Sequence, residues 1–336
     1  MKKSMFMKIY IIPSIIISPI FSLSCNSWFS IWMSLEFNLM TFIPFMIFFN
    51  KFFKEVSIKY FIIQAISSSM LLLSSNLMMI FNNYSQNLNF FIIMINIAVL
   101  IKLGAAPFHS WFIQLMNNLN WTNCLILSTW QKIIPLILIM YLNYPKLIFS
   151  TIIICSITGT LLGLNHQSIR IMLSYSSINH ISWLLLNLMF SEWMLLIYFI
   201  SYFIINLSMM MLFNMTKIYY LNQLFFLNNK LIKLCIIINL FALSGLPPSF
   251  GFIMKWMSLY YSMWQFNSLT ILIILMLSIL TFIYYMRLNI IFLMNFNLSN
   301  KLILLNKFFH FNSIYMLLLF FFTQSFNLWI MSFWMS

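Results

Sequence analysis

Residues 102–111 read Lys-Leu-Gly-Ala-Ala-Pro-Phe-His-Ser-Trp, and residues 244–256 read Ser-Gly-Leu-Pro-Pro-Ser-Phe-Gly-Phe-Ile-Met-Lys-Trp. Both stretches break long apolar segments, and each contains a Gly-x-x-Pro core that begins at Gly104 or at Gly245. Proline removes a helical hydrogen bond and glycine loosens the backbone, so this pattern predicts two interrupted helices. Inside a membrane, the freed backbone groups must be buried in protein or face water.

The composition indicates that these breaks belong to a membrane protein. The chain has 336 residues, of which 63% are hydrophobic, 19% aromatic and only 6% charged, and its mean hydropathy is +0.98. No soluble globular domain has this composition. Runs of about 18 or more apolar residues predict an all-α polytopic membrane protein with about eleven transmembrane helices in one membrane domain, residues 1–336. The expected spans are Phe6–Leu23, Trp28–Phe49, Ile58–Phe81, Leu88–Ala106, Trp121–Leu142, Leu147–Leu164, Ile171–Phe190, Trp193–Met215, Leu231–Leu246, Leu269–Arg287 and Phe311–Ile330.

Positive charges are distributed unequally between the two sides of this topology. Three lysines lie inside spans, thirteen Lys and Arg residues fall on the side of the N-terminus, and only Lys146 falls on the other side, which accounts for all 17. The positive-inside rule therefore places the N-terminus on the non-translocated side and the C-terminus on the opposite side. The formal charge of +14 then reflects topology and attraction to anionic phospholipid headgroups, and it does not indicate nucleic-acid binding.

Amino-acid usage also bears on where the gene resides. Residues encoded by codons that begin with G are scarce, since Val, Ala, Asp, Glu and Gly number 2, 5, 0, 3 and 5. The 28 methionines fit a genetic code that reads AUA as Met. We interpret the gene as part of an animal-type organelle genome, for which no import peptide is expected. A membrane protein from an AT-rich bacterium is the alternative.

Four ionisable residues lie inside the apolar spans and are functional candidates for that reason. They are Glu36, Lys102, Lys132 and Lys255. Each central charge costs about 2.5 to 3.5 kcal/mol on insertion scales. Two cations about 10 Å apart at an effective dielectric of about 20 repel each other by about 1.7 kcal/mol, so a proton that arrives at one amine tends to expel the proton of its neighbour. A stepwise proton relay requires such coupling, and the cationic excess favours protons over sodium.

The two breaks stand five spans apart, so they are expected to cross the membrane in opposite directions. This arrangement predicts an inverted-topology repeat, with residues 6–142 as the first five-helix repeat, residues 147–287 as the second, and residues 311–330 as a C-terminal helix. The alternative is that Gly/Pro pairs only kink these helices, as they often do in membrane proteins.

Several stretches, in this order along the chain, resemble one known family. They are WMSLEFN (32–38) followed by FIP (42–44), KLGAAPFHSW (102–111), WQKIIP (130–135), SYSSINHISW (174–183) and LSGLPPSFGFIMKW (243–256). Over essentially its whole length the chain resembles the NADH-ubiquinone oxidoreductase chain 2 family, antiporter-like membrane-arm subunits of mitochondrial respiratory complex I. The resemblance implies an antiporter-like fold of fourteen helices shortened at its start, which leaves eleven. One departure is Ile171, where family members often have a second basic residue after Arg170.

The resemblance also implies a proton path through the buried ionisable residues. Glu36, Lys102, Lys132 and Lys255 match the family's proposed proton-path residues, and His180 is a weaker match. In our hypothesis Glu36 pairs with Lys102, and Lys132 is the central carrier between two half-channels. Lys255 carries protons toward the exit side, and His180 assists as a neutral donor and acceptor. The alternatives are that Lys132 snorkels or satisfies carbonyls of a broken helix, and that His180 makes only an interhelical hydrogen bond.

The implied protein is a subunit of an H⁺-translocating NADH:ubiquinone reductase in the mitochondrial inner membrane, with its N-terminus in the matrix and its C-terminus toward the intermembrane space. Its expected partners are the other membrane-arm and accessory subunits of complex I, and phospholipids such as cardiolipin. The sequence has no cysteine cluster, no metal-ligand spacing, no G-x-G-x-x-G and no P-loop. NADH, FMN, iron–sulfur clusters and ubiquinone are therefore expected in other subunits. A stand-alone cation/proton antiporter and a purely structural membrane subunit are the alternatives.

Overall fold

The structure, a computed structural model, describes residues 2–49, 54–81, 85–227, 230–247, 249–263 and 268–294, and this part of the chain consists of helices joined by short non-helical segments. Its elements are α1 (Lys2–Leu23), α2 (Trp28–Phe49), α3 (Lys54–Ile80), α4 (Ser85–Leu103), α5 (Ser110–Asn118), α6 (Trp121–Ser128), η1 (Trp130–Lys132), α7 (Ile133–Tyr141), α8 (Pro145–Leu161), η2 (Leu162–Asn165), α9 (Ile169–Leu188), α10 (Glu192–Thr216), η3 (Leu221–Phe226), α11 (Lys230–Ser244), α12 (Phe250–Ser262) and α13 (Ser268–Met294), where η marks a short 3₁₀ helix. The expected C-terminal helix at residues 311–330 lies outside the described residues, as does Pro248.

Six helical segments of the described residues are long and apolar enough to cross a membrane. Each has at least the roughly 20 residues that span a hydrocarbon core about 30 Å thick. The prediction of an all-helical membrane protein is therefore confirmed, whereas the count of eleven spans stays a prediction. The six segments are Trp28–Ile47, Glu55–Ile80, Trp121–Tyr141, Pro145–Asn165, Glu192–Thr216 and Thr270–Phe292.

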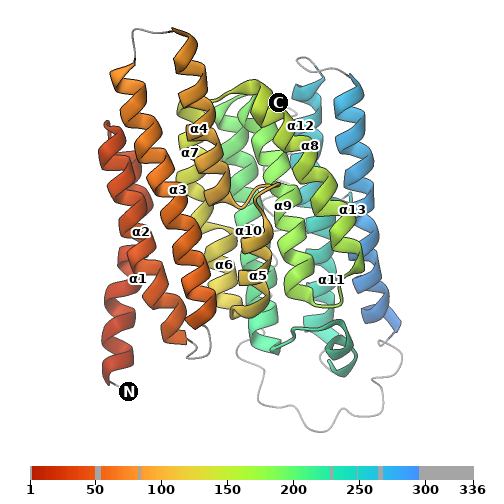
Figure 1. Cartoon of the computed structure of the whole chain (residues 1–336). Coiled ribbons are helices and arrows are strands. Elements are labelled where there is room, and N and C mark those ends of the chain that lie inside the picture. The colour runs from red at the N-terminus through yellow and green to blue at the C-terminus, as the bar shows by residue number, and fades with distance from the viewer. Residues whose placement is uncertain are drawn as a thin grey trace. The chain divides into compact units, whose positions relative to one another are not determined.

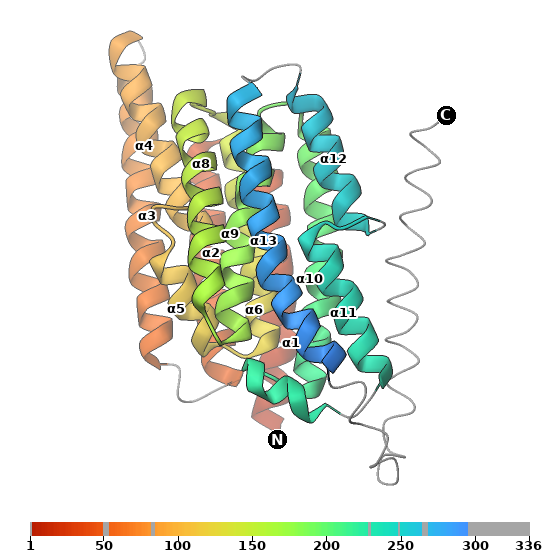
Figure 2. The ribbon, with the colours of Figure 1, turned by 90° about the vertical axis from the view of Figure 1, so that its right-hand side faces the viewer.

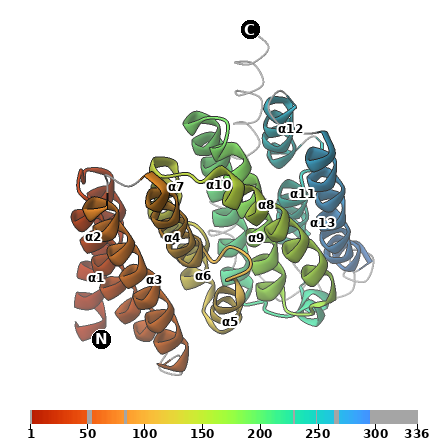
Figure 3. The same ribbon diagram turned by 45° about the horizontal axis from the view of Figure 1, so that its top comes forward.

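The helices form two compact units, and the first comprises Met1–Thr151. In this unit α1, α2, α3 and α4 pack in chain order, each against the next, and α7 packs against both α1 and α4. Figure 3 shows α1, α2 and α3 side by side. In Figure 1, α4 lies in the upper half of this unit and α5 in the lower half, with the non-helical residues 104–109 between them.

The second unit, Ile152–Ser336, is built around α9, which packs against α10 and α12. Nearly every residue of α9 is buried, the polar Asn179 and His180 included. A helix that is buried on all sides belongs to the core of its unit, and its serines satisfy themselves by bonding carbonyls one turn earlier, as Ser176 does to Leu173. Figure 2 shows α12 above α11, with the connecting segment at mid-height, and α13 beside them.

Glycine ends both helices at which the sequence predicts an interruption. Gly104 follows α4 with φ +69°, and Gly245 follows α11 with φ +80°. Only glycine adopts this left-handed conformation freely, and it lets the next backbone N–H groups turn back onto the last helical carbonyls. Ala105 N accordingly donates to the Leu100 carbonyl at 3.1 Å, and Leu246 N to the Phe241 carbonyl at 3.2 Å.

A third glycine allows α11 and α12 to approach closely. A Cβ atom placed on Gly251 would lie 1.9 Å from the carbonyl oxygen of Ala242 in α11. Backbone cannot yield as a flexible side chain does, so any larger residue has to push the two helices apart. The close contact between α11 and α12 therefore requires a glycine at position 251.

We expect Gly251→Ala to lower the free energy of unfolding by at least about 1–3 kcal/mol, the usual cost of overpacking. The matched control is Gly163→Ala in η2, where the nearest atoms to a new Cβ are 3.4 Å away, in ordinary contact. Thermal unfolding of the detergent-extracted protein measures both. Equal melting temperatures for the two variants would contradict the close approach.

Candidate functional site

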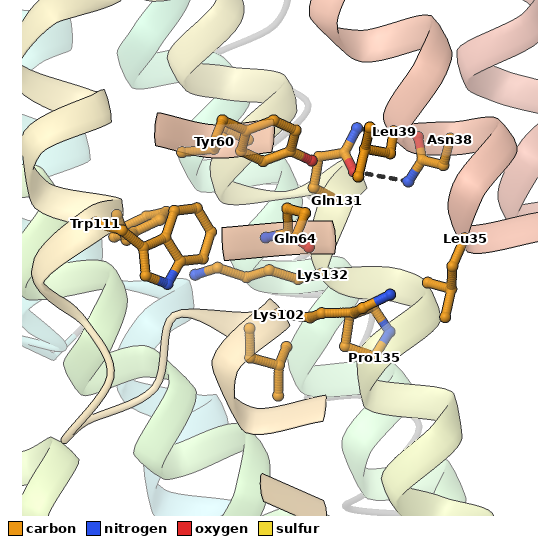
Figure 4. A pocket seen from close by; sticks show the side chains of 13 residues that line it. Leu35, Asn38, Leu39, Tyr60, Gln64, Lys102, Trp111, Gln131, Lys132 and Pro135 are labelled. Carbon is orange, nitrogen blue, oxygen red and sulfur yellow. Dashed lines mark hydrogen bonds between the residues drawn. The ribbon is translucent and has the colours of Figure 1, made fainter. Parts of the chain in front are cut away.

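Lys102 and Lys132 line one cavity in the first unit, and only 7% and 2% of their respective side-chain areas are exposed. The cavity has about 20 Å³ available to the centres of water-sized spheres, which is room for about one water molecule. Figure 4 shows the Lys132 side chain reaching toward Trp111 across it. The lining residues are Leu35, Asn38, Leu39, Tyr60, Gln64, Lys102, Leu103, Trp111, Phe112, Leu127, Gln131, Lys132 and Pro135.

Lys102 lies in the last turn of α4, just before the stop at Gly104. The carbonyl end of a helix carries a partial negative charge that attracts an ammonium group. The carboxylate of Glu36 in α2 attracts the same amine electrostatically. Glu36 is half-buried and accepts a hydrogen bond from the Ser68 hydroxyl of α3. Three helices, α2, α3 and α4, thus hold this acid and this amine in one neighbourhood.

Lys132 ends the short η1 segment between α6 and α7. Pro135 explains the irregularity, because its ring would clash with the carbonyl of Gln131 in a continuous α-helix and it has no N–H to donate. The backbone tightens instead, and Lys132 N donates to the Thr129 carbonyl at 3.1 Å. The Lys132 amine lies 5.3 Å from the centre of the Phe112 ring, within the range of a cation–π contact.

A pair of amides fixes η1 against α2. Asn38 Nδ2 donates to Gln131 Oε1 at 2.7 Å, and Gln131 Nε2 donates back to Asn38 Oδ1 at 3.1 Å, as the dashed line in Figure 4 marks for the first of these bonds. Gln131 immediately precedes Lys132, so this pair sets the position from which the lysine side chain extends. Neither amide stands out in the sequence as a candidate for this role.

A polar stripe on α3 completes the surroundings of the first-unit site and was also missed. Tyr60 and Gln64 line the cavity, and Ser68 bonds Glu36. These residues recur every four positions and therefore share one face of the helix. That spacing within an otherwise apolar segment is a signal that sequence reasoning could have used.

Lys255 lies in α12 of the second unit and is 7% exposed. Its Nζ donates to the Ser244 carbonyl at 2.8 Å, a group at the end of α11 that has no helical partner. Gly245 makes room for this contact, because a Cβ there would lie 2.9 Å from the Lys255 side chain. Lys255, Trp183 and Ser278 line a second cavity, with about 210 Å³ available to the centres of water-sized spheres.

His180 lies in the buried helix α9, one turn before Trp183. Its Nδ1 is 3.0 Å from the Tyr198 hydroxyl of α10, and its ring centre is 4.9 Å from that of Tyr202. The structure thus places Glu36, Lys102 and Lys132 together in the first unit, and Lys255 and His180 in neighbouring parts of the second. Among the described residues, no three His, Cys, Asp or Glu side chains form a metal-binding group.

Comparison with known proteins assigns the family. A profile described as "NADH:quinone oxidoreductase/Mrp antiporter, TM" matches residues 25–283. The NADH-ubiquinone oxidoreductase chain 2 of Anopheles gambiae is 41% identical over 317 residues, which cover 89% of this chain and 93% of that protein. The chain belongs to the NADH-ubiquinone oxidoreductase chain 2 family.

Solved structures share the fold of this chain 2 family member. A chain of an archaeal membrane-bound sulfane sulfur reductase matches with a TM-score of 0.82 and 17% identity, over 95% of this chain and 72% of that one. A chain of respiratory complex I from Thermus thermophilus matches with a TM-score of 0.77 and 18% identity, over 84% and 69%. At such identities the likeness concerns the arrangement of helices alone.

In this chain 2 family member we expect Asn38→Leu to lower the free energy of unfolding by about 1 kcal/mol, because the half-buried Gln131 amide loses both of its hydrogen bonds to Asn38. Thr41→Val on the same helix is the control, since the Thr41 hydroxyl donates to the carbonyl of Asn38 within its own helix, one turn earlier, and joins no second element among the described residues. Thermal unfolding in detergent compares the two. A milder effect for Asn38→Leu than for Thr41→Val would show that the amide pair does not hold η1.

Proposed function

We propose that the chain is a proton-translocating membrane-arm subunit of respiratory complex I in the mitochondrial inner membrane. The observation that carries this proposal is the pair of buried amines, Lys102 and Lys132, on one water-sized cavity with the Glu36 carboxylate close by. Ionisable groups at this depth are costly and mark ion or proton pathways in membrane proteins. The family assignment and the six apolar spans agree with that location.

In the first unit, a proton is held in turn by Lys102 and Lys132. Lys102 is the better place for a cation, because Glu36 and the carbonyl end of α4 both attract it. Lys132 has an aromatic ring beside it and the amino end of α7 behind it. One water between the two amines can pass the proton from one nitrogen to the other. Repulsion between two charged amines then favours release of one proton when another arrives.

In the second unit, Lys255 is the carrier on the exit side and His180 assists it. Charged Lys255 is held by the Ser244 carbonyl, and its cavity is large enough for several waters. His180 can accept a proton on one ring nitrogen and release one from the other. Its hydrogen bond to Tyr198 connects it to α10. We further propose that α4–α5 and α11–α12 are two membrane crossings, each interrupted at its glycine.

The inverted repeat of residues 6–142 and 147–287 belongs to the same proposal. It is supported by the shared geometry of the two interruptions. Each has a left-handed glycine just after the helix, and in each the N–H of the residue after that glycine bonds the carbonyl of the fourth residue from the helix end. The charge distribution supports an N-terminus in the matrix and a C-terminus toward the intermembrane space. NADH, FMN, iron–sulfur clusters and ubiquinone are then held by other subunits, and this subunit contributes proton translocation to the reductase. Its partners are the remaining membrane-arm and accessory subunits and phospholipids such as cardiolipin.

We expect Lys132→Met to abolish proton pumping coupled to NADH oxidation while the assembled complex remains, because the buried amine is lost and a side chain of similar length replaces it. Lys59→Met is the matched control, since Lys59 is an exposed lysine of the same unit that bonds Gln114. Proton uptake per NADH, measured in inner-membrane vesicles, separates the two. Undiminished pumping in Lys132→Met would reject the carrier role and favour a purely structural subunit.

Glu36→Gln and Ser68→Ala separate the charge of the acid from its hydrogen bond. Glutamine keeps an acceptor for the Ser68 hydroxyl but removes the negative charge that attracts Lys102, whereas Ser68→Ala keeps the charge and removes the bond. We expect Glu36→Gln to slow NADH oxidation coupled to pumping more strongly than Ser68→Ala. The reverse order, in complexes assembled to equal amounts, would mean that Glu36 serves only to join α2 and α3.

The stand-alone antiporter is distinguished by transport without redox partners. The chain purified alone and placed in vesicles with an imposed pH gradient should exchange no cation, because in the proposed function its protons are driven by the electron transfer of the whole complex. Cation-dependent proton flux in such vesicles would favour the antiporter.

A further inference from the structure

One face of α13 carries polar residues through an otherwise apolar helix. Ser278, Thr281, Tyr285 and Asn289 are spaced three, four and four residues apart, so they lie on one side of the helix. The span around them, Thr270–Phe292, is among the most apolar of the described chain, with a hydropathy of 2.2. We call these four residues the α13 polar stripe; no role for it follows from the sites described above.

The α13 polar stripe extends from the cavity of the buried Lys255 to the exposed surface around Arg287. Ser278 lines the Lys255 cavity. At the other end, Arg287 lies between Tyr285 and Asn289 in the sequence, is exposed, and donates to the Leu164 carbonyl of η2 at 3.3 Å. The distance along the helix axis from Ser278 to Asn289 is about 16 Å at 1.5 Å per residue. A few water molecules between the polar side chains of the stripe are enough to span this distance.

That end of the second unit is a charged surface. Ile169 N donates to the Tyr219 carbonyl at 2.9 Å, which joins the start of α9 to the segment after α10. The Arg170 guanidinium stacks 4.4 Å from the centre of the Tyr219 ring, and Lys217 is exposed at the end of α10. The α13 polar stripe therefore begins next to Arg287 and runs inward to a buried amine, and the contacts of α13 with η2 and η3 place this end near the segments that carry Arg170 and Lys217.

Its outermost member has polar atoms without a partner, since both amide atoms of Asn289 are buried and make no hydrogen bond to the described residues. The hydroxyls of Tyr284 and Tyr285 are also buried; they lie close to each other, and Tyr285 lies close to Ser176, but no well-aligned hydrogen bond joins them. Asn289 and the two tyrosines are at most 1% exposed. A buried amide or hydroxyl left unpaired costs about 1–3 kcal/mol, and native proteins avoid this cost by placing ordered water beside such groups.

The hydroxyl oxygens of the two inner members, Ser278 and Thr281, can still accept hydrogen bonds. The Thr281 hydroxyl donates to the Ser278 carbonyl at 2.6 Å, and the Ser278 hydroxyl donates to the Leu275 carbonyl at 2.7 Å. Each hydroxyl oxygen still has lone pairs for a water. Tyr285 also faces the side chain of Ser176 in α9 and interacts electrostatically with Tyr198 and Tyr202, which are the aromatic neighbours of His180.

We infer that the α13 polar stripe is a proton-uptake route from the arginine-bearing surface of the second unit to Lys255. Waters ordered by Asn289 and Tyr285 receive a proton at the surface. Each water or hydroxyl passes on the proton that it holds as it accepts the next, so no group of the stripe keeps the charge. The Lys255 amine accepts the last proton. This inference rests on the proposed function and adds to it the residues that supply its second unit.

The test uses the assembled complex in inner-membrane vesicles from cells that carry Tyr285→Phe or Asn289→Leu, with Tyr260→Phe on the exposed face of α12 as control. We expect both stripe variants to lower coupled NADH oxidation severalfold and to raise its solvent deuterium isotope effect, because proton uptake becomes limiting. The control should change neither quantity. A structural role alone would not move the isotope effect at equal amounts of assembled complex.

A high-resolution electron density map of the wild-type complex is the second measurement, and it serves even where a variant fails to assemble. We expect waters within hydrogen-bond distance of Tyr285 Oη and the Asn289 amide. A dry stripe, or a Tyr285→Phe complex that melts at a higher temperature with an unchanged isotope effect, would overturn the inference. If Lys132→Met abolishes pumping while the stripe variants behave as the control does, only this inference fails; if Lys132→Met pumps normally, the proposed function fails.

Discussion

A helix that stops among apolar helices leaves carbonyl groups that only protein donors or water can satisfy, and this constraint shapes both candidate sites. After α4, the N–H groups of Gly104 and Ala105 donate to two carbonyls of the last helical turn, and the Trp111 indole donates to the Ile101 carbonyl at 3.1 Å. After α11, the Lys255 amine bonds the Ser244 carbonyl. The polar ends created by the stops are the places where buried amines find favourable partners.

The two units meet this constraint with different chemistry. In the first unit, the indole N–H of Trp111 bonds a carbonyl at the end of α4, so the amines of Lys102 and Lys132 are left to line a small polar cavity. In the second, the amine itself closes the helix end, and the cavity around it is larger and mostly apolar. A proton on Lys255 therefore strengthens a structural contact, and its loss weakens that contact. In the proposed function, proton transfer in this unit is coupled to the α11–α12 junction, which Gly251 holds tightly packed.

The buried polar residues also divide into those that satisfy themselves and those that require others. Serines and threonines bond carbonyls of their own helix, as Ser176 does in α9, and cost little in an apolar setting. Amides differ from one position to the next. Asn96 and Asn206 donate to carbonyls four residues earlier in their own helices, and Asn38 and Gln131 satisfy each other across two elements. Asn289 of α13 makes neither kind of bond within the described residues.

Local sequence determined the class of the protein and the places where helices stop, because hydropathy and the left-handed freedom of Gly104 and Gly245 act over only a few residues. It also singled out the buried ionisable residues, whose charge stands out against apolar neighbours. Only the tertiary structure decided their partners: Ser68 for Glu36, the Ser244 carbonyl for Lys255, and the Asn38–Gln131 pair beside Lys132. Such partners come from helices far apart in the chain, and the faces that meet are set by packing rather than by any local preference.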